Sequence, residues 1–161
     1  MQNESLLSSP TRKQLVEWRV FLETAYALID ILDAELKAER GITLGWYDAL
    51  VHLEEAEDGL RMNELAGRIL FSKSGLTRVI DRMEEADLVR RERPADDRRV
   101  VKVYITQEGL ETLQAARTVH RRGIKEHFVQ HLDQQELATL AHSLENVRDH
   151  VRPLRPDRIS G

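Results

Sequence analysis

Apolar residues recur at steps of three and four positions in the first part of the chain. One such stretch follows Thr11, a residue type that caps helices, and predicts a helix to about Glu39 with Gly41 as its stop. A second stretch follows Thr43 and predicts a helix that ends at about Glu57. The first helix would carry a long apolar face, formed by Leu15, Trp18, Phe21, Leu22, Ala25, Leu28, Ile29, Leu32 and Leu36.

The same period returns near the end of the chain. Thr106 is placed to cap a helix that runs to about His131. Asp133, with Glu136 three residues later, is placed to cap a final helix, which Pro153 would end. The apolar face of this last helix is formed by Leu137, Leu140, Ala141, Leu144, Val147 and Val151.

The pattern is shorter and more varied between these long helices. A short helix is expected from Asn63 to Ile69 and a second from Ser72 to about Ala86, joined by about three residues, which is typical of a helix-turn-helix. Residues 88–93 and 100–105 then read as two strands, because the second of them alternates and is rich in β-branched side chains. They predict a β-hairpin with a charged tip. The fold class is therefore mainly α with a small β-wing.

Length and composition limit the classes of protein. A chain of 161 residues without cysteine fits one domain of two lobes, and it excludes disulfides and thiolate metal sites. No stretch is long and apolar enough for a membrane span, and the first residues do not resemble a secretory signal, so we expect a cytoplasmic protein with no membrane partner. Residues 1–10 and 153–161 are expected to be flexible tails.

The net charge of −4 argues at first against a nucleic-acid binder, but the charge is unevenly distributed. Residues 61–106 hold eleven Lys and Arg against eight acids, which gives +3 for this segment and −7 for the rest of the chain. Nucleic-acid affinity depends on cations within reach of phosphates, and salt screens charges beyond about 8–10 Å. The predicted helix-turn-helix and hairpin therefore remain a candidate DNA-binding surface.

The candidate contacts lie on the second helix of the motif and on the hairpin. A recognition helix leads with its N-terminal residues, here Ser72, Lys73, Ser74, Thr77 and Arg78, with Arg82 one turn further on. The hairpin offers Arg93, Asp97, Arg98 and Arg99, and arginine suits a narrow minor groove. The alternatives are a solvated helix with a capping serine and an ordinary charged hairpin loop.

These residues resemble the MarR family of winged helix-turn-helix transcription regulators. The resemblance rests on the runs at 63–66, 72–78 and 81–90, and on Asp97-Arg-Arg99 followed by Ile105-Thr106 in the wing pattern. It covers about residues 11–152. Two positions depart from the family. Asp87 stands where glycine is common, and it tolerates a left-handed backbone. Met62 stands where a capping Ser or Thr is common, so Asn63 is expected to cap the helix and shift its start by one residue.

The resemblance implies a homodimer and roles for particular residues. It implies that residues 11–40 and 106–152 form a helical dimerisation region and that residues 41–105 form the winged helix-turn-helix region. A purely intramolecular core for the apolar helix faces is the alternative. It also implies that Arg99 enters the minor groove with support from Asp97, while the residues from Ser72 to Arg78 face the major groove.

Relatives of this kind often bind small phenols or aromatic acids between the two regions. Here that implies a ligand crevice lined by Trp18, Tyr26, Trp46 and Tyr47, with Arg19, Asp48 and His52 as polar anchors. The alternative is that these aromatic residues are plain core.

Three histidines, His120, His127 and His131, also share part of one predicted helix. A zinc site needs three or four ligands in fixed geometry, and the histidines alone do not provide it, so we expect solvated or core histidines and no metal or cofactor.

The sequence thus predicts a double-stranded DNA-binding transcriptional regulator and not an enzyme. In its specific form the prediction is a homodimeric repressor of a pseudo-palindromic operator, released by a small aromatic ligand. Two alternatives stay open: a helical protein-interaction module without an operator, and a small hydrolase that uses the histidines with a metal.

Overall fold

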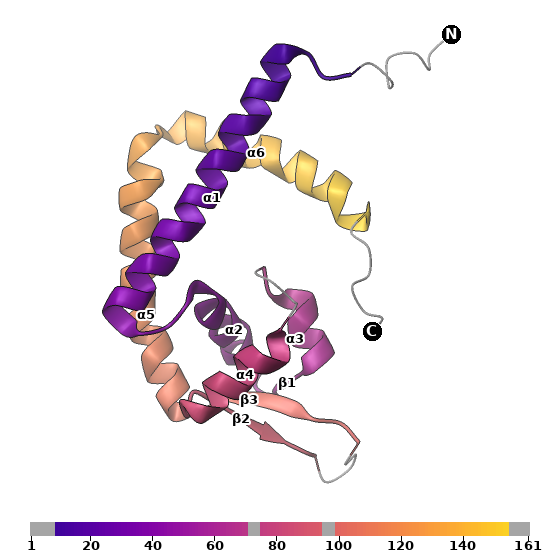
Figure 1. Ribbon diagram of the computed structural model, residues 1–161, viewed down its shortest axis with the longest axis vertical. Coiled ribbons are helices and arrows are strands. Elements are labelled where there is room, and N and C mark those ends of the chain that lie inside the picture. Colours follow the sequence, from indigo (N-terminus) through magenta and orange to yellow (C-terminus); the bar gives the residue numbers. More distant parts are fainter. Residues whose placement is uncertain (1–8, 71–74, 95–98, 155–161) are drawn as a thin grey trace.

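The computed structural model describes residues 9–70, 75–94 and 99–154, and every structural statement below refers to these residues. Within them the chain is mainly helical with one small three-stranded antiparallel sheet, as predicted (Figure 1). The expected tails fall almost entirely on residues outside this range, apart from a short stretch at each end.

The two N-terminal helices begin where their capping residues predict. Helix α1 spans Arg12–Arg40, and the Thr11 side chain accepts a hydrogen bond from the Gln14 amide at 3.3 Å. Helix α2 spans Leu44–Glu54, capped by Thr43. Its predicted end at about Glu57 is wrong by three residues, because the chain leaves the helix in a turn closed by the bond from the Gly59 amide to the Ala56 carbonyl at 2.8 Å.

The C-terminal helices also begin at their predicted caps, Thr106 and Asp133. Helix α5 spans Gln107–His127, a 3₁₀ turn follows at Val129–His131, α6 spans Gln134–Val151, and a last 3₁₀ turn covers Arg152–Leu154. The predicted single helix to about His131 is therefore divided. Its last turn is separate because Phe128 leaves the helical conformation, with a φ of −132°.

The helix-turn-helix consists of α3, Met62–Arg68, and α4, Leu76–Glu85. The prediction that Asn63 caps α3 is wrong: the cap is Arg61, whose amide donates to the Glu64 carboxylate at 2.7 Å. The predicted start of α4 at Ser72 is also wrong. Gly75, with a φ of +84°, lies directly before Leu76, and a left-handed residue cannot continue a right-handed helix.

The sheet adds one strand to the predicted hairpin. Strands β2, Val89–Glu92, and β3, Lys102–Ile105, pair antiparallel, and β1, Leu60–Arg61, pairs with the other edge of β3. Asp87 turns the chain from α4 into β2 with a φ of +57°, the left-handed conformation that the sequence predicted it would tolerate.

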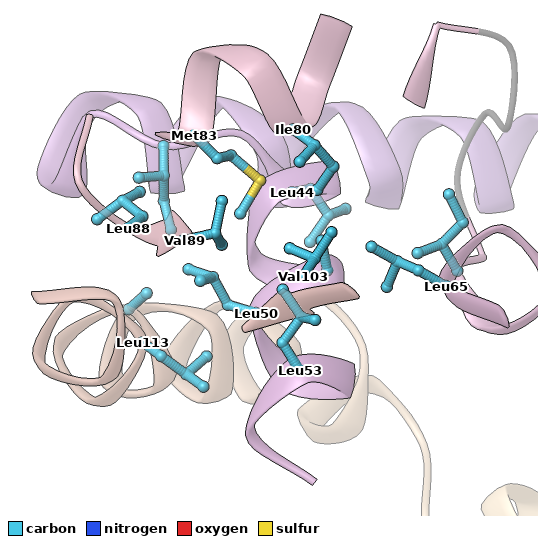
Figure 2. Close-up of a cluster of buried hydrophobic side chains, with 14 of the residues drawn as sticks. Leu44, Leu50, Leu53, Leu65, Ile80, Met83, Leu88, Val89, Val103 and Leu113 are labelled. Carbon is cyan, nitrogen blue, oxygen red and sulfur yellow. The ribbon is translucent and has the colours of Figure 1, made fainter. Parts of the chain in front are cut away.

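One hydrophobic core joins the sheet to its helices (Figure 2). Helices α2, α3, α4 and α5 and strands β2 and β3 each contribute at least one fully buried side chain to this core. These side chains include Leu50, Leu53, Leu65, Ile80, Met83, Val89, Val103 and Leu113. Helices α2, α3 and α4, strands β2 and β3, and the first half of α5 are therefore held as one unit. The outer faces of α4 and the hairpin are fixed by this packing.

Helices α1 and α6 are much less covered. Helix α1 packs along α5 yet fully buries only Leu36, and α6 buries no residue (Figure 1). Their exposed large apolar side chains include Leu15, Val16, Trp18, Val20, Phe21, Tyr26, Ile29, Ile31, Leu144, Val147 and Val151. A purely intramolecular core therefore does not account for the predicted apolar faces. No helix in the described part of the chain is long and apolar enough to cross a membrane.

Candidate nucleic-acid interface

Helix α4 has one buried face and one cationic face. Leu76, Ile80 and Met83 pack into the core, whereas three of the predicted contact residues, Thr77, Arg78 and Arg82, are exposed. Arg78 and Arg82 are one helical turn apart, so their side chains share a face. Neither makes an ion pair with another described residue. Both guanidinium groups are thus available to an anionic partner.

The hairpin carries further exposed cations. Arg93 follows β2 and is exposed, and Arg99, also exposed, precedes β3 at the other side of the tip. The remaining predicted contact residues lie outside the described part of the chain, namely Ser72, Lys73, Ser74, Asp97 and Arg98.

A polar clamp joins the hairpin to the recognition helix. Arg91 of β2 binds the Asp81 carboxylate at 2.6 Å and the Glu84 carboxylate at 2.7 Å, both on α4. The Arg91 amide also donates to Glu84 at 2.8 Å. Partial burial tends to lower the pKa of Arg91, but the hydrogen bonds to Asp81 and Glu84 outweigh it, and the pKa is raised. The clamp fixes the angle between α4 and the wing.

The sequence did not reveal this clamp. In the sequence, Arg91 counts only as one of the cations of residues 61–106, and Asp81 and Glu84 count only as two of its acids. Only the pairing of β2 with β3 and the packing of α4 against β2 bring the three together. Arg91 lies on a strand and both of its partners lie on a helix, so no single helical or strand period relates the three positions.

A second contact holds the segment after α3. The Asp48 carboxylate on α2 is buried and accepts a hydrogen bond from the Leu70 amide at 2.7 Å. His52, one turn further along α2, lies 3.6 Å from the same carboxylate. Of these two predicted ligand anchors, Asp48 therefore joins α2 to the segment after α3, and His52 lies beside Asp48 on the same helix.

The four aromatic residues predicted to line a crevice occupy two different environments. Trp18 and Tyr26 are 56% and 66% exposed on α1, whereas Trp46 and Tyr47 are half-buried against the core. The Tyr47 ring lies 4.5 Å from the ring of His120 on α5. Burial raises the pKa of Tyr47 and lowers that of His120. The buried Nδ1 atom of His120 has no hydrogen-bond partner among the described residues.

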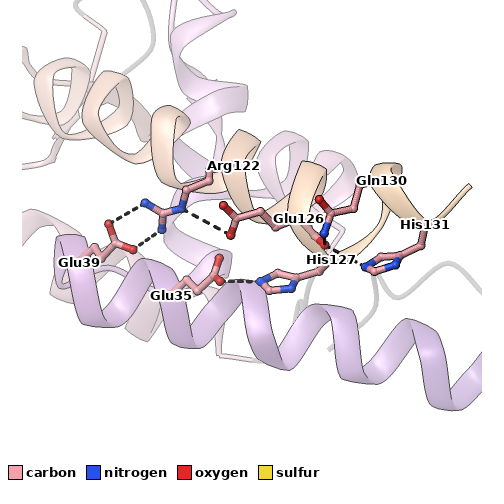
Figure 3. Close-up of polar contacts among 7 residues, drawn as sticks. All are labelled: Glu35, Glu39, Arg122, Glu126, His127, Gln130 and His131. Atoms are coloured by element: carbon pink, nitrogen blue, oxygen red, sulfur yellow. Dashed lines mark hydrogen bonds and ion pairs between the residues drawn. The ribbon is translucent and has the colours of Figure 1, made fainter.

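The other two histidines that the sequence analysis considered as metal ligands, His127 and His131, lie at the end of α5 and in the 3₁₀ turn that follows it. The His127 ring is 2.6 Å from the Glu35 carboxylate of α1, and the His131 ring is 3.0 Å from the Glu126 carbonyl (Figure 3). His120 is separated from them and does not join this group.

Known proteins resemble this chain in both sequence and fold. Residues 40–100 match the model of the MarR family. The chain is 35% identical to AbsC, a MarR family transcriptional regulator from Streptomyces coelicolor, whose structure it matches with a TM-score of 0.81 over 91% of this chain and 99% of that one. It is 28% identical to Sco3205 from the same organism, solved in complex with DNA, with a TM-score of 0.84 over 93% and 94% of the two chains. It is also 28% identical to the Bacillus subtilis transcriptional repressor MdtR, over 67% of this chain and 68% of that one.

The fold and the cationic helix-and-wing surface define a winged helix-turn-helix DNA-binding protein. The chain belongs to the MarR family of transcriptional regulators and is not an enzyme.

Proposed function

We propose that this regulator is a homodimeric repressor that reads a pseudo-palindromic operator with one α4 helix per half-site. The observation that carries the proposal is the exposed row of Thr77, Arg78 and Arg82 on a helix clamped to the wing through Arg91. A helix of this kind fits the major groove. A fixed angle between the helix and the wing would fix the distance along the DNA between the contacts of α4 and those of the wing.

Each cation has a distinct proposed role. Arg78, near the start of α4, contacts base edges, whereas Arg82 lies a turn further on and neutralises a phosphate. Arg99 enters the adjacent minor groove, where the potential is strongly negative, with Asp97 in support. The similarity to a relative solved in complex with DNA supports DNA binding, and the similarity to a repressor supports repression.

The second half of the proposal is the dimer. The exposed apolar side chains on α1 and α6 would be costly to leave in water, and a second copy offers the same faces for mutual burial. Two winged lobes would then be held at a fixed spacing, which a two-fold symmetric operator requires.

The test is to select genomic fragments with the purified, untagged protein and to map the protected bases. The proposal expects enrichment of fragments that contain two inverted half-sites about one helical turn apart, with two protomers bound per site. Retention on random duplex DNA with no enriched sequence would contradict the operator. No retention of DNA at all would instead favour the protein-interaction module.

We also propose that an aromatic ligand acts between α2 and α5, beside Tyr47 and His120. The unpartnered Nδ1 atom of His120 supports this, because a phenol or carboxylate could supply the missing hydrogen bond while its ring packs on Tyr47. A thermal-shift screen with phenols and aromatic carboxylates is expected to give hits that His120→Phe abolishes. A screen without any stabilising compound would contradict the ligand.

A further inference from the structure

A group of metal-ligating side chains lies where α1 passes the end of α5 (Figure 3). Glu35, Glu126 and His127 each offer one ligand atom, and these atoms all lie within 4.8 Å of one another. Glu35 and His127 are 92 residues apart in the chain and already share a hydrogen bond of 2.6 Å. The fold therefore assembles a set of donors that the spacing of the histidines alone did not reveal.

One atom of this group lacks a partner. The second carboxylate oxygen of Glu35, Oε2, is buried and has no hydrogen-bond partner among the described residues. Gly123 on α5 makes room for it, since a Cβ there would lie 2.4 Å from Oε2. A buried carboxylate oxygen without a partner is costly, and a cation between α1 and α5 would remove that cost.

The nearest arginine does not fill this role. Arg122 is engaged by Glu39, one turn further along α1, through both ends of its guanidinium group. Its closest approach to the cluster is 4.0 Å, to the Glu126 carboxylate (Figure 3). Among the described residues, the Glu35 carboxylate pairs with a histidine and lies near a second carboxylate, but it forms no ion pair with an arginine or lysine.

We propose that Glu35, Glu126 and His127 bind a divalent transition-metal ion of the zinc class. One imidazole and two carboxylates are a ligand set that zinc accepts at about 2.0–2.2 Å, with a fourth position left for water. The imidazole disfavours magnesium and calcium, which prefer oxygen ligands. On binding, the ion replaces the hydrogen bond between Glu35 and His127, and the proton on Nε2 is released to solvent.

The ion would join α1 to α5 at the end remote from the sheet. It would stabilise the packing of the two helices, since an ion that binds only the folded state adds to stability by mass action. The inference does not depend on DNA binding, because it concerns only these three side chains. A failed operator test would leave it intact, and a failed metal test would leave the operator intact.

The experiment is a calorimetric titration of the untagged, chelator-treated protein with zinc chloride, repeated with magnesium chloride. We expect about one zinc ion bound per chain, no heat from magnesium, and a higher unfolding temperature with zinc. Glu35→Gln, Glu126→Gln and His127→Gln should each lower zinc affinity by about tenfold or more. Glu126 is exposed, so its variant keeps the fold even if the other two disturb the contact between the helices.

Two matched variants serve as controls. Glu39→Gln removes an acid from the same face of α1, and His142→Gln removes an exposed histidine from α6; both should bind zinc as the wild type does. Absence of zinc binding by the wild type would overturn the proposal. Equal zinc affinity in the wild type, Glu126→Gln and His127→Gln would overturn it as well.

Discussion

His120 shows how a single residue can combine burial with titratable chemistry. Its ring packs on Tyr47 between α5 and α2, its Nδ1 atom has no partner among the described residues, and burial lowers its pKa below the usual 6.5. The folded protein therefore favours the neutral ring. The sequence placed His120 among the core or solvated histidines, but whether it was buried depended on contacts with α2 that no local pattern encodes.

We expect His120→Phe to reduce the acid sensitivity of folding. Below about pH 6.5 the unfolded chain binds a proton at His120 that the folded protein resists, so wild-type stability falls until the pH reaches the lowered pKa. The variant lacks this contribution, which amounts to at most about 1.4 kcal/mol per pH unit for one proton. Urea unfolding at pH 7.5, 6.5 and 5.5 measures it. Identical pH profiles for the two proteins would contradict the assignment.

At the scale of elements, the sequence predicts best what depends on near neighbours. The caps at Thr11, Thr43, Thr106 and Asp133 mark the starts of four helices, because each side chain bonds to an amide three residues away. The two-residue strand β1 was missed because only its pairing with β3 defines it. The start of α4 was misplaced because the serines suggested a cap, whereas Gly75 lies between them and the helix.

The packing of α5 on the sheet gives a prediction at this scale. Gly109, in the first turns of α5, lies so close to the end of α4 that a Cβ would stand 2.1 Å from the Leu88 carbonyl oxygen. Gly109→Ala should therefore destabilise the fold by about 1–3 kcal/mol, because backbone must move to admit the methyl group. Denaturant unfolding measures this.

Gly67→Ala is the matched control. Gly67 is exposed in α3, and a Cβ there would meet nothing within 4 Å, so alanine should be neutral or stabilise by about 0.5–1 kcal/mol. Equal stability of the two alanine variants would contradict the close approach of α5 to Leu88.

At the scale of the whole molecule, the chain has two parts that differ in how far their apolar side chains are buried. The sheet, α2, α3, α4 and the lower half of α5 share a closed core, whereas α6 buries nothing and α1 exposes a row of apolar residues (Figure 1). The sequence predicted both apolar faces from their period. It could not decide what covers them, because amphipathic spacing is the same for a core within one chain and for a subunit interface.

A charged residue on the α6 face should separate the dimer that we propose. Leu144→Glu places a carboxylate among the exposed apolar residues Val147 and Val151 and should shift the protein from two chains to one in light scattering after size exclusion. His142→Glu adds the same charge to the opposite face of α6 and should leave the dimer intact. A dimer that survives Leu144→Glu, or a wild type that is monomeric, would contradict this interface.

We claim that the cationic face of α4 binds DNA, and fluorescence anisotropy on a selected fragment over a range of salt concentrations measures this binding. Compared with the wild type, Arg78→Ala should weaken binding by about 1–3 kcal/mol, and Arg82→Ala should lower the salt slope by about one. Lys125→Ala, which removes an exposed cation from α5, should change neither quantity. Equal affinities and slopes for all four proteins would contradict the claim.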